Sequence, residues 1–121
     1  MSYERILFGI AGLWNLIGAC LLVFAPEMQL SRLGIDDPQA KWLARMLASS
    51  ATTWGIAYLL IAWDAQRFHD LIWLGTISKI LFAVITAAGF FTGALSLAAF
   101  APGLIDLVFA LLFAEVLWRT R

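Results

Sequence analysis

The stretch Lys41-Trp-Leu-Ala-Arg-Met-Leu-Ala-Ser-Ser-Ala-Thr-Thr-Trp-Gly-Ile-Ala-Tyr-Leu-Leu-Ile-Ala-Trp63 decides the fold class of this chain. It is long enough to cross a bilayer as a helix, which takes ~20 residues for ~30 Å of hydrocarbon. It nevertheless carries Arg45 inside its apolar span and a band of hydroxyls along its middle, namely Ser49, Ser50, Thr52 and Thr53. An arginine in hydrocarbon is costly, so the other apolar segments are expected to offer it a polar partner.

The composition places the whole chain in a membrane. Of its 121 residues, 63% are hydrophobic and only 13% are charged, whereas charged residues make up about a quarter of a typical soluble domain. Four apolar segments, at about 5–25, 40–63, 71–92 and 98–118, each approach membrane-spanning length. Helices satisfy their own backbone in lipid, and closed barrels need more segments than this. We therefore predict an all-α bundle of four transmembrane helices, forming a single domain over residues 1–121.

The loops and the basic residues give the predicted topology. Residues 26–38 form the only sizeable polar loop, and their pattern predicts a short interfacial helix ending near Gly34, with Asp36 or Asp37 as the cap of the next helix. Basic residues outside the spans are more frequent on the side of the termini: Arg5, Arg67, Arg119 and Arg121, against Arg32 and Lys41 on the other side. The positive-inside rule then puts both termini in the cytoplasm. Pro102 is expected in the first turn of the last helix.

Several functional classes are disfavoured. The formal net charge is zero, with eight basic and eight acidic residues, so there is no electrostatic footprint for nucleic acid. One Cys20 and one His69 provide no zinc, iron–sulfur or bis-histidine haem set, and the acidic residues of the loop lack calcium-loop spacing. No nucleophile–base set or phosphate loop is present, so we predict no catalytic residue, no metal site and no cofactor.

Polar residues inside the spans form a predicted polar seam. With a rise of ~1.5 Å per residue, Arg45 and Asp106 fall at similar depths in the outer half of the membrane, and we predict that they pair. Lys79 lies near mid-membrane, at the level of Asn15. On its helix, small and polar residues recur at spacings of three and four, which puts Lys79 on an inward face: Gly75, Lys79, Phe82, Thr86, Gly89 and Gly93.

Two interpretations of the seam stay open. It is either a structural lock that fixes helix register, or the lining of a small polar cavity for a ligand, an ion or a proton. Glu115 is expected to pair with Arg119 one turn on, which leaves Lys79 as the cation without an evident anion. The candidate site residues are Arg45, Lys79, Asp106, Asn15, Ser49, Thr52 and Thr53.

Short motifs resemble those of the DoxX-like bacterial membrane proteins. They are Phe24-Ala-Pro26, Leu33-Gly34, and Arg45 with Gly55 and Tyr58 in the second long segment. The resemblance covers the four-helix layout. It implies a multi-pass protein of the bacterial inner membrane and, in some relatives, association with other membrane or redox proteins. It carries over no catalytic residue.

Two functions follow as hypotheses. The first is a non-enzymatic accessory or assembly subunit, with membrane lipids around it and itself or other membrane subunits as partners. The second is a carrier or channel for a small anion, metabolite or lipid, centred on Lys79 and Arg45. An enzyme acting on a lipid-soluble substrate has no specific residue in its favour.

Overall fold

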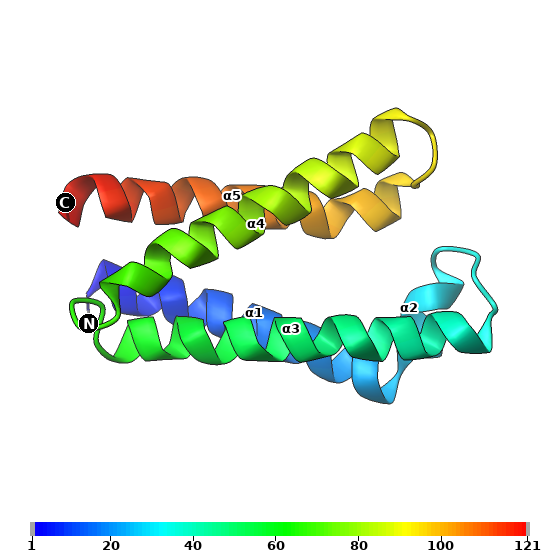
Figure 1. Ribbon diagram of the computed structural model, residues 1–121, viewed down its shortest axis with the longest axis horizontal. Helices are drawn as coiled ribbons and strands as arrows, with labels where there is room; N and C mark the ends of the chain where they lie inside the picture. Colours follow the sequence, from blue (N-terminus) through cyan, green and yellow to red (C-terminus); the bar gives the residue numbers. More distant parts are fainter. Residues whose placement is uncertain (1, 121) are drawn as a thin grey trace. The chain divides into compact units, whose positions relative to one another are not determined.

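The computed structural model describes residues 2–120, which are mostly helical and contain no strand. Its helices are α1 (Tyr3–Phe24), α2 (Pro26–Ser31), α3 (Pro38–Trp63), α4 (His69–Phe91) and α5 (Leu97–Thr120) (Figure 1). Within the described residues, the four helices other than α2 are long and apolar enough to cross a membrane. The predicted all-α class with four membrane-length helices is confirmed, and these lengths and compositions are those of a multi-pass membrane protein.

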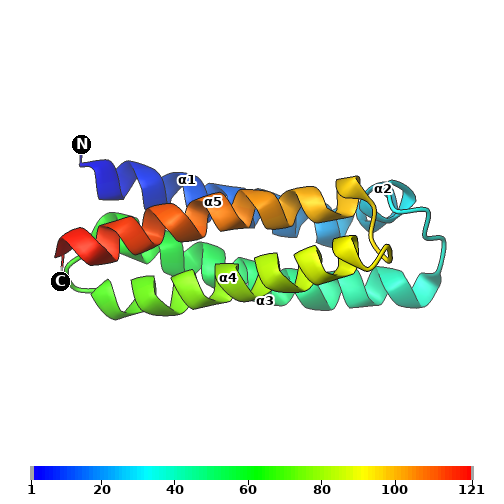
Figure 2. The ribbon, with the colours of Figure 1, turned by 90° about the horizontal axis from the view of Figure 1, so that it is seen from above.

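The chain divides into two compact units, one ending at Phe68 and one beginning at His69. In the first unit α1 and α3 run antiparallel, and Figures 1 and 2 both show α2 at the end of this hairpin that lies away from the N-terminus. In the second unit α4 and α5 form an antiparallel hairpin. Each core described below lies inside one unit, so the single domain over residues 1–121 stays a prediction.

The loop between α2 and α3 follows the turn chemistry expected from its sequence. Gly34 has a φ of +71°, and its N–H donates to the Ser31 carbonyl at 3.1 Å while the Ile35 N–H donates to the Leu30 carbonyl at 3.0 Å. This is the Schellman arrangement, in which glycine takes the left-handed position that ends a helix. Asp37 caps α3 by accepting the Gln39 N–H at 3.0 Å, with Pro38 at the first helical position. Both predicted features are confirmed.

The start of α5 corrects one prediction. The helix begins at Leu97, capped by the Ser96 hydroxyl, which accepts the Ala99 N–H at 3.2 Å. Pro102 therefore lies inside the helix instead of in its first turn. The reason is that Ser96 supplies a side-chain acceptor, so the helix starts at Leu97, more than one turn before the proline.

In the first hairpin, α1 and α3 pack closely at two glycines, Gly12 and Gly55. A Cβ on Gly12 would lie 2.8 Å from Leu59 Cδ2 and 3.0 Å from the Gly55 carbonyl oxygen, and a Cβ on Gly55 would lie 2.8 Å from Leu16 Cγ. The two backbones can approach this closely only because neither residue has a side chain. A leucine of each helix then fills the space over the glycine of the other, so α1 and α3 interlock reciprocally.

At the end of this hairpin that carries the N-terminus, an arginine side chain is hydrogen-bonded to the opposite helix. The Arg5 side chain donates to the carbonyls of Ala62, at 3.2 Å, and Trp63, at 3.5 Å. These carbonyls belong to the last turn of α3, where a helix leaves its acceptors unused. The contact joins the start of α1 to the end of α3.

Candidate functional site

The central polar feature of the second hairpin is an ion pair between α4 and α5. Lys79 Nζ donates to Asp106 Oδ1 at 2.8 Å, with the lysine side chain 3% exposed and the aspartate side chain 16% exposed. The ammonium also lies 5.0 Å from the centroid of the Phe109 ring, one turn along α5 from Asp106. A cation over an aromatic face gains electrostatic stabilisation that is larger when water is excluded.

Small residues bring α4 and α5 close enough for this pair to form. The buried face of α4 carries Ile72, Gly75, Thr76, Lys79, Ala83 and Thr86. Opposite it, Gly103 packs against Thr86 so closely that a Cβ there would overlap the threonine hydroxyl. That hydroxyl donates to carbonyls of its own helix, Phe82 at 2.9 Å and Ala83 at 3.1 Å. The cation is thus held in a tightly packed seam.

The predicted inward face of α4 is confirmed in its centre and wrong at its end. Gly75, Lys79 and Thr86 are buried together. Gly93 lies beyond Phe91, where α4 ends, and has a φ of +83°. It belongs to the turn before α5, because a left-handed residue ends the helix instead of extending its face.

Asp106 takes a different partner from the one predicted. The prediction gave its carboxylate to Arg45 and left Lys79 without an anion, whereas the structure gives it to Lys79. Arg45 lies in the other unit, where its Nε donates to the Val23 carbonyl at 3.1 Å and its guanidinium lies 4.7 Å from the Trp42 ring centroid. Val23 is in the last turn of α1, so the arginine satisfies a helix C-terminus that carries partial negative charge.

The remaining candidate residues are also satisfied inside the first unit. Asn15 Nδ2 donates to the Ala51 carbonyl at 3.3 Å and so bridges α1 to α3. Three hydroxyls of α3 donate to carbonyls of their own helix: Ser49 to Met46 at 2.7 Å, Thr52 to Ala48 at 2.8 Å, and Thr53 to Ser49 at 3.0 Å. Thr52 is half-buried, whereas Ser49 and Thr53 are exposed. The band of hydroxyls therefore does not point as a whole toward α1.

Two further polar contacts lie near helix ends, one within α5 and one between α4 and α5. Glu115 and Arg119 form the predicted pair one turn apart, with Arg119 Nε 2.6 Å from Glu115 Oε1. His69 Nε2 lies 2.9 Å from the Thr120 hydroxyl and ties the start of α4 to the end of α5. The second contact was not predicted. The sequence signal for it was a polar residue at the start of one helix and another at the end of the next, because these two ends meet in an antiparallel hairpin.

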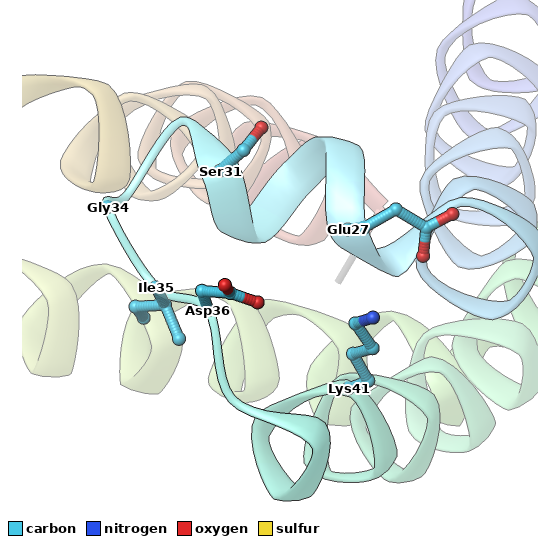
Figure 3. Close-up of a pocket in the computed structure, with 6 residues that line it drawn as sticks. All are labelled: Glu27, Ser31, Gly34, Ile35, Asp36 and Lys41. Atoms are coloured by element: carbon cyan, nitrogen blue, oxygen red, sulfur yellow. The ribbon is translucent and has the colours of Figure 1, made fainter.

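The first unit contains a cavity between α2, its following loop and the first turn of α3. It measures about 370 Å³ and is lined by Glu27, Ser31, Gly34, Ile35, Asp36 and Lys41 (Figure 3). Within residues 2–120 no group of three or more histidine, cysteine, aspartate or glutamate residues is arranged to hold a metal ion. The cavity mixes charges of both signs and was not predicted from the sequence.

Comparison with models of protein families, with curated proteins and with solved structures finds no match for this chain. The resemblance to the DoxX-like proteins consequently rests on the short sequence motifs alone.

Proposed function

We propose that the chain is a non-enzymatic membrane subunit that assembles, through the face of α3 turned away from α1, with a second copy of itself or with other membrane proteins. The observation that carries the proposal is the exposed position of Ser49, Ser50 and Thr53 on a helix of membrane-spanning length. Lipid gives no hydrophobic drive for helices to associate, and small and hydroxyl-bearing residues are enriched where they pack.

The rest of α3 agrees with this role. It is the least apolar of the four long helices. The hydroxyls of Ser49 and Thr53 donate to carbonyls of their own helix, so these two side chains are compatible with lipid before assembly and offer a close, small-residue contact after it. An interface of this kind needs no unpaired charge in the membrane.

The ion pair of the second hairpin weighs against a carrier or channel centred on Lys79. A bound anion would have to displace the Asp106 carboxylate, which lies 2.8 Å from the ammonium. Arg45 is similarly engaged with the Val23 carbonyl. The assembly hypothesis is preferred because it does not require either contact to break.

The proposal also covers the side of the membrane on which the termini lie and the membrane that holds the protein. An even number of spanning helices puts both termini on one side of the membrane, and the excess of arginine near the termini favours the cytoplasm. The resemblance to DoxX-like proteins favours the bacterial inner membrane. The partners are then lipids and other inner-membrane subunits.

Site-specific photocross-linking tests the interface. A photoreactive residue at position 53 is expected to capture one defined protein in native membranes, either this chain or a subunit identified by mass spectrometry. The same probe at Ile10, which is exposed on α1, serves as the control and should capture lipid. Thr53→Leu should reduce the native mass of the complex, and capture of lipid alone from position 53 would refute the interface.

A further inference from the structure

The cavity beside α2 has the chemistry of a binding site for a zwitterion. It is an open surface pocket of about 370 Å³, in which Lys41 is half-buried and the other five lining residues are exposed. Lys41 reaches it from the first turn of α3, while Glu27 comes from α2 and Asp36 from the loop (Figure 3). Two acids and one base from three segments therefore border one space.

These three charged side chains are not used to hold the fold together. Within residues 2–120, the side chains of Glu27, Asp36 and Lys41 form no ion pair and no hydrogen bond. Figure 3 shows the lysine ammonium extending from α3 into the space beneath α2. Asp37, by contrast, is occupied as the cap of α3. The charges around the cavity are thus available to a ligand.

The local backbone holds the lining residues in place. The Schellman turn at Gly34 folds the chain back after α2, and it brings Ile35 and Asp36 over the start of α3. Leu30 and Pro26 of α2 are buried against the hairpin. The cavity is therefore formed by ordered segments with defined ends.

Large apolar side chains are exposed on the segments that form the cavity and at the end of α1, which precedes them. Phe24 at the end of α1 is 81% exposed, and Trp42 next to Lys41 is 64% exposed. Met28, Leu33 and Ile35 of α2 and its loop are also exposed. Exposed aromatic and aliphatic residues at the end of a spanning helix are typical of the membrane interface. An occupant with a charged head and an apolar tail fits both sets of residues.

We propose that this cavity binds the head group of a phospholipid that carries a primary ammonium, as phosphatidylethanolamine does. The ammonium is placed against the carboxylates of Glu27 and Asp36, and the phosphate against the Lys41 ammonium. A primary ammonium has three N–H donors for these carboxylates, whereas a choline head group has none. The head group of an anionic glycerol lipid has no cation to pair with the carboxylates of Glu27 and Asp36. This site is independent of the assembly interface on α3.

Lipid binding to the full-length chain in detergent micelles tests the proposal by native mass spectrometry. Phosphatidylethanolamine, phosphatidylcholine and phosphatidylglycerol with identical acyl chains are compared as probes. The ethanolamine lipid should bind most tightly. Glu27→Gln, Asp36→Asn and Lys41→Gln should each weaken its binding about tenfold, the usual effect of losing a hydrogen bond to a charged group.

Two controls separate the site from general electrostatics. Arg32→Gln changes a charge on the same loop outside the cavity lining, and Asp70→Asn removes an exposed acid at the start of α4. Neither should alter lipid binding. Because these three lining side chains form no hydrogen bond or ion pair within residues 2–120, their variants should retain the helical circular dichroism of the parent chain.

Three results would overturn the proposal. Equal or tighter binding of the choline or glycerol lipid excludes recognition of the ammonium. Unchanged binding in the three lining variants places the lipid elsewhere. Soluble phosphoethanolamine is the remaining probe, and binding as tight as that of the lipid would mean that the occupant is a free zwitterion instead of a lipid.

Discussion

Separating Lys79 from Asp106 tests how the α4–α5 hairpin is held together. We expect Lys79→Met and Asp106→Leu each to lower the free energy of unfolding by about 3–5 kcal/mol, because each removes the oppositely charged partner of a buried group. Asp106→Leu should cost more. The ammonium that it leaves behind is 3% exposed, whereas the carboxylate left by Lys79→Met is 16% exposed.

The magnitude follows from the geometry of the pair. At the observed 2.8 Å, the Coulomb attraction is about 6 kcal/mol for an effective dielectric constant of about 20. Removing both groups from water costs about as much, several kcal/mol for each ion, so the intact pair contributes little net stability. The double variant Lys79→Met/Asp106→Leu should therefore range from equally stable to about 1–4 kcal/mol more stable than the parent chain.

Equilibrium unfolding of the four proteins in mixed micelles, followed by helical circular dichroism, gives the coupling energy. The coupling should approach the sum of the two single losses, since the second substitution removes the charge that the first left unpaired. A double variant that is as unstable as the two single losses added together would refute the reasoning. The contact would then be incidental to the stability of the hairpin.

Three further substitutions test the packing, each measured by the same unfolding assay. Gly12→Ala should destabilise the first hairpin by about 1–3 kcal/mol, because its Cβ would lie 2.8 Å from Leu59, whereas Gly18→Ala, with nothing within 4 Å, should be neutral or stabilising. Gly103→Ala should cost a similar amount, about 1–3 kcal/mol, through overlap with Thr86, and Thr86→Ala should partly restore stability; no restoration would contradict the assigned contact. Arg45→Met should cost about 1 kcal/mol by removing the hydrogen bond to Val23, and an unchanged stability would show that this bond contributes nothing.

The helices and their ends could be predicted because their signals are local. The lengths of the apolar segments predicted the four long helices. Gly34 and Asp37 predicted where α2 ends and α3 begins, because glycine favours the turn and aspartate the cap. The Glu115–Arg119 pair was predictable for the same reason, since residues four apart on a helix are neighbours. Each of these features depends on a few consecutive residues.

The partners of the intramembrane cations were mispredicted because charges were matched by depth alone. Depth does not say which helices are neighbours, and the short connection at 92–96 already favoured α4 beside α5. Arg45 was mispredicted for another reason. Its acceptor is the backbone carbonyl of Val23, and the sequence alone did not reveal that the end of α1 would lie beside it. The cavity at Lys41 was missed because its lining comes from separate segments.

The separation of Lys79 and Asp106 along the chain has a consequence for biogenesis. The two residues are 27 positions apart, so at roughly 5–20 residues per second the ribosome delivers the aspartate about 1–5 s after the lysine. Until then α4 lacks the carboxylate that pairs with its lysine, and a lysine at the centre of a helix entering the bilayer through the translocon costs about 2.5–3.5 kcal/mol. We therefore expect α4 to partition into lipid more readily once α5 has emerged, so that the two helices insert together.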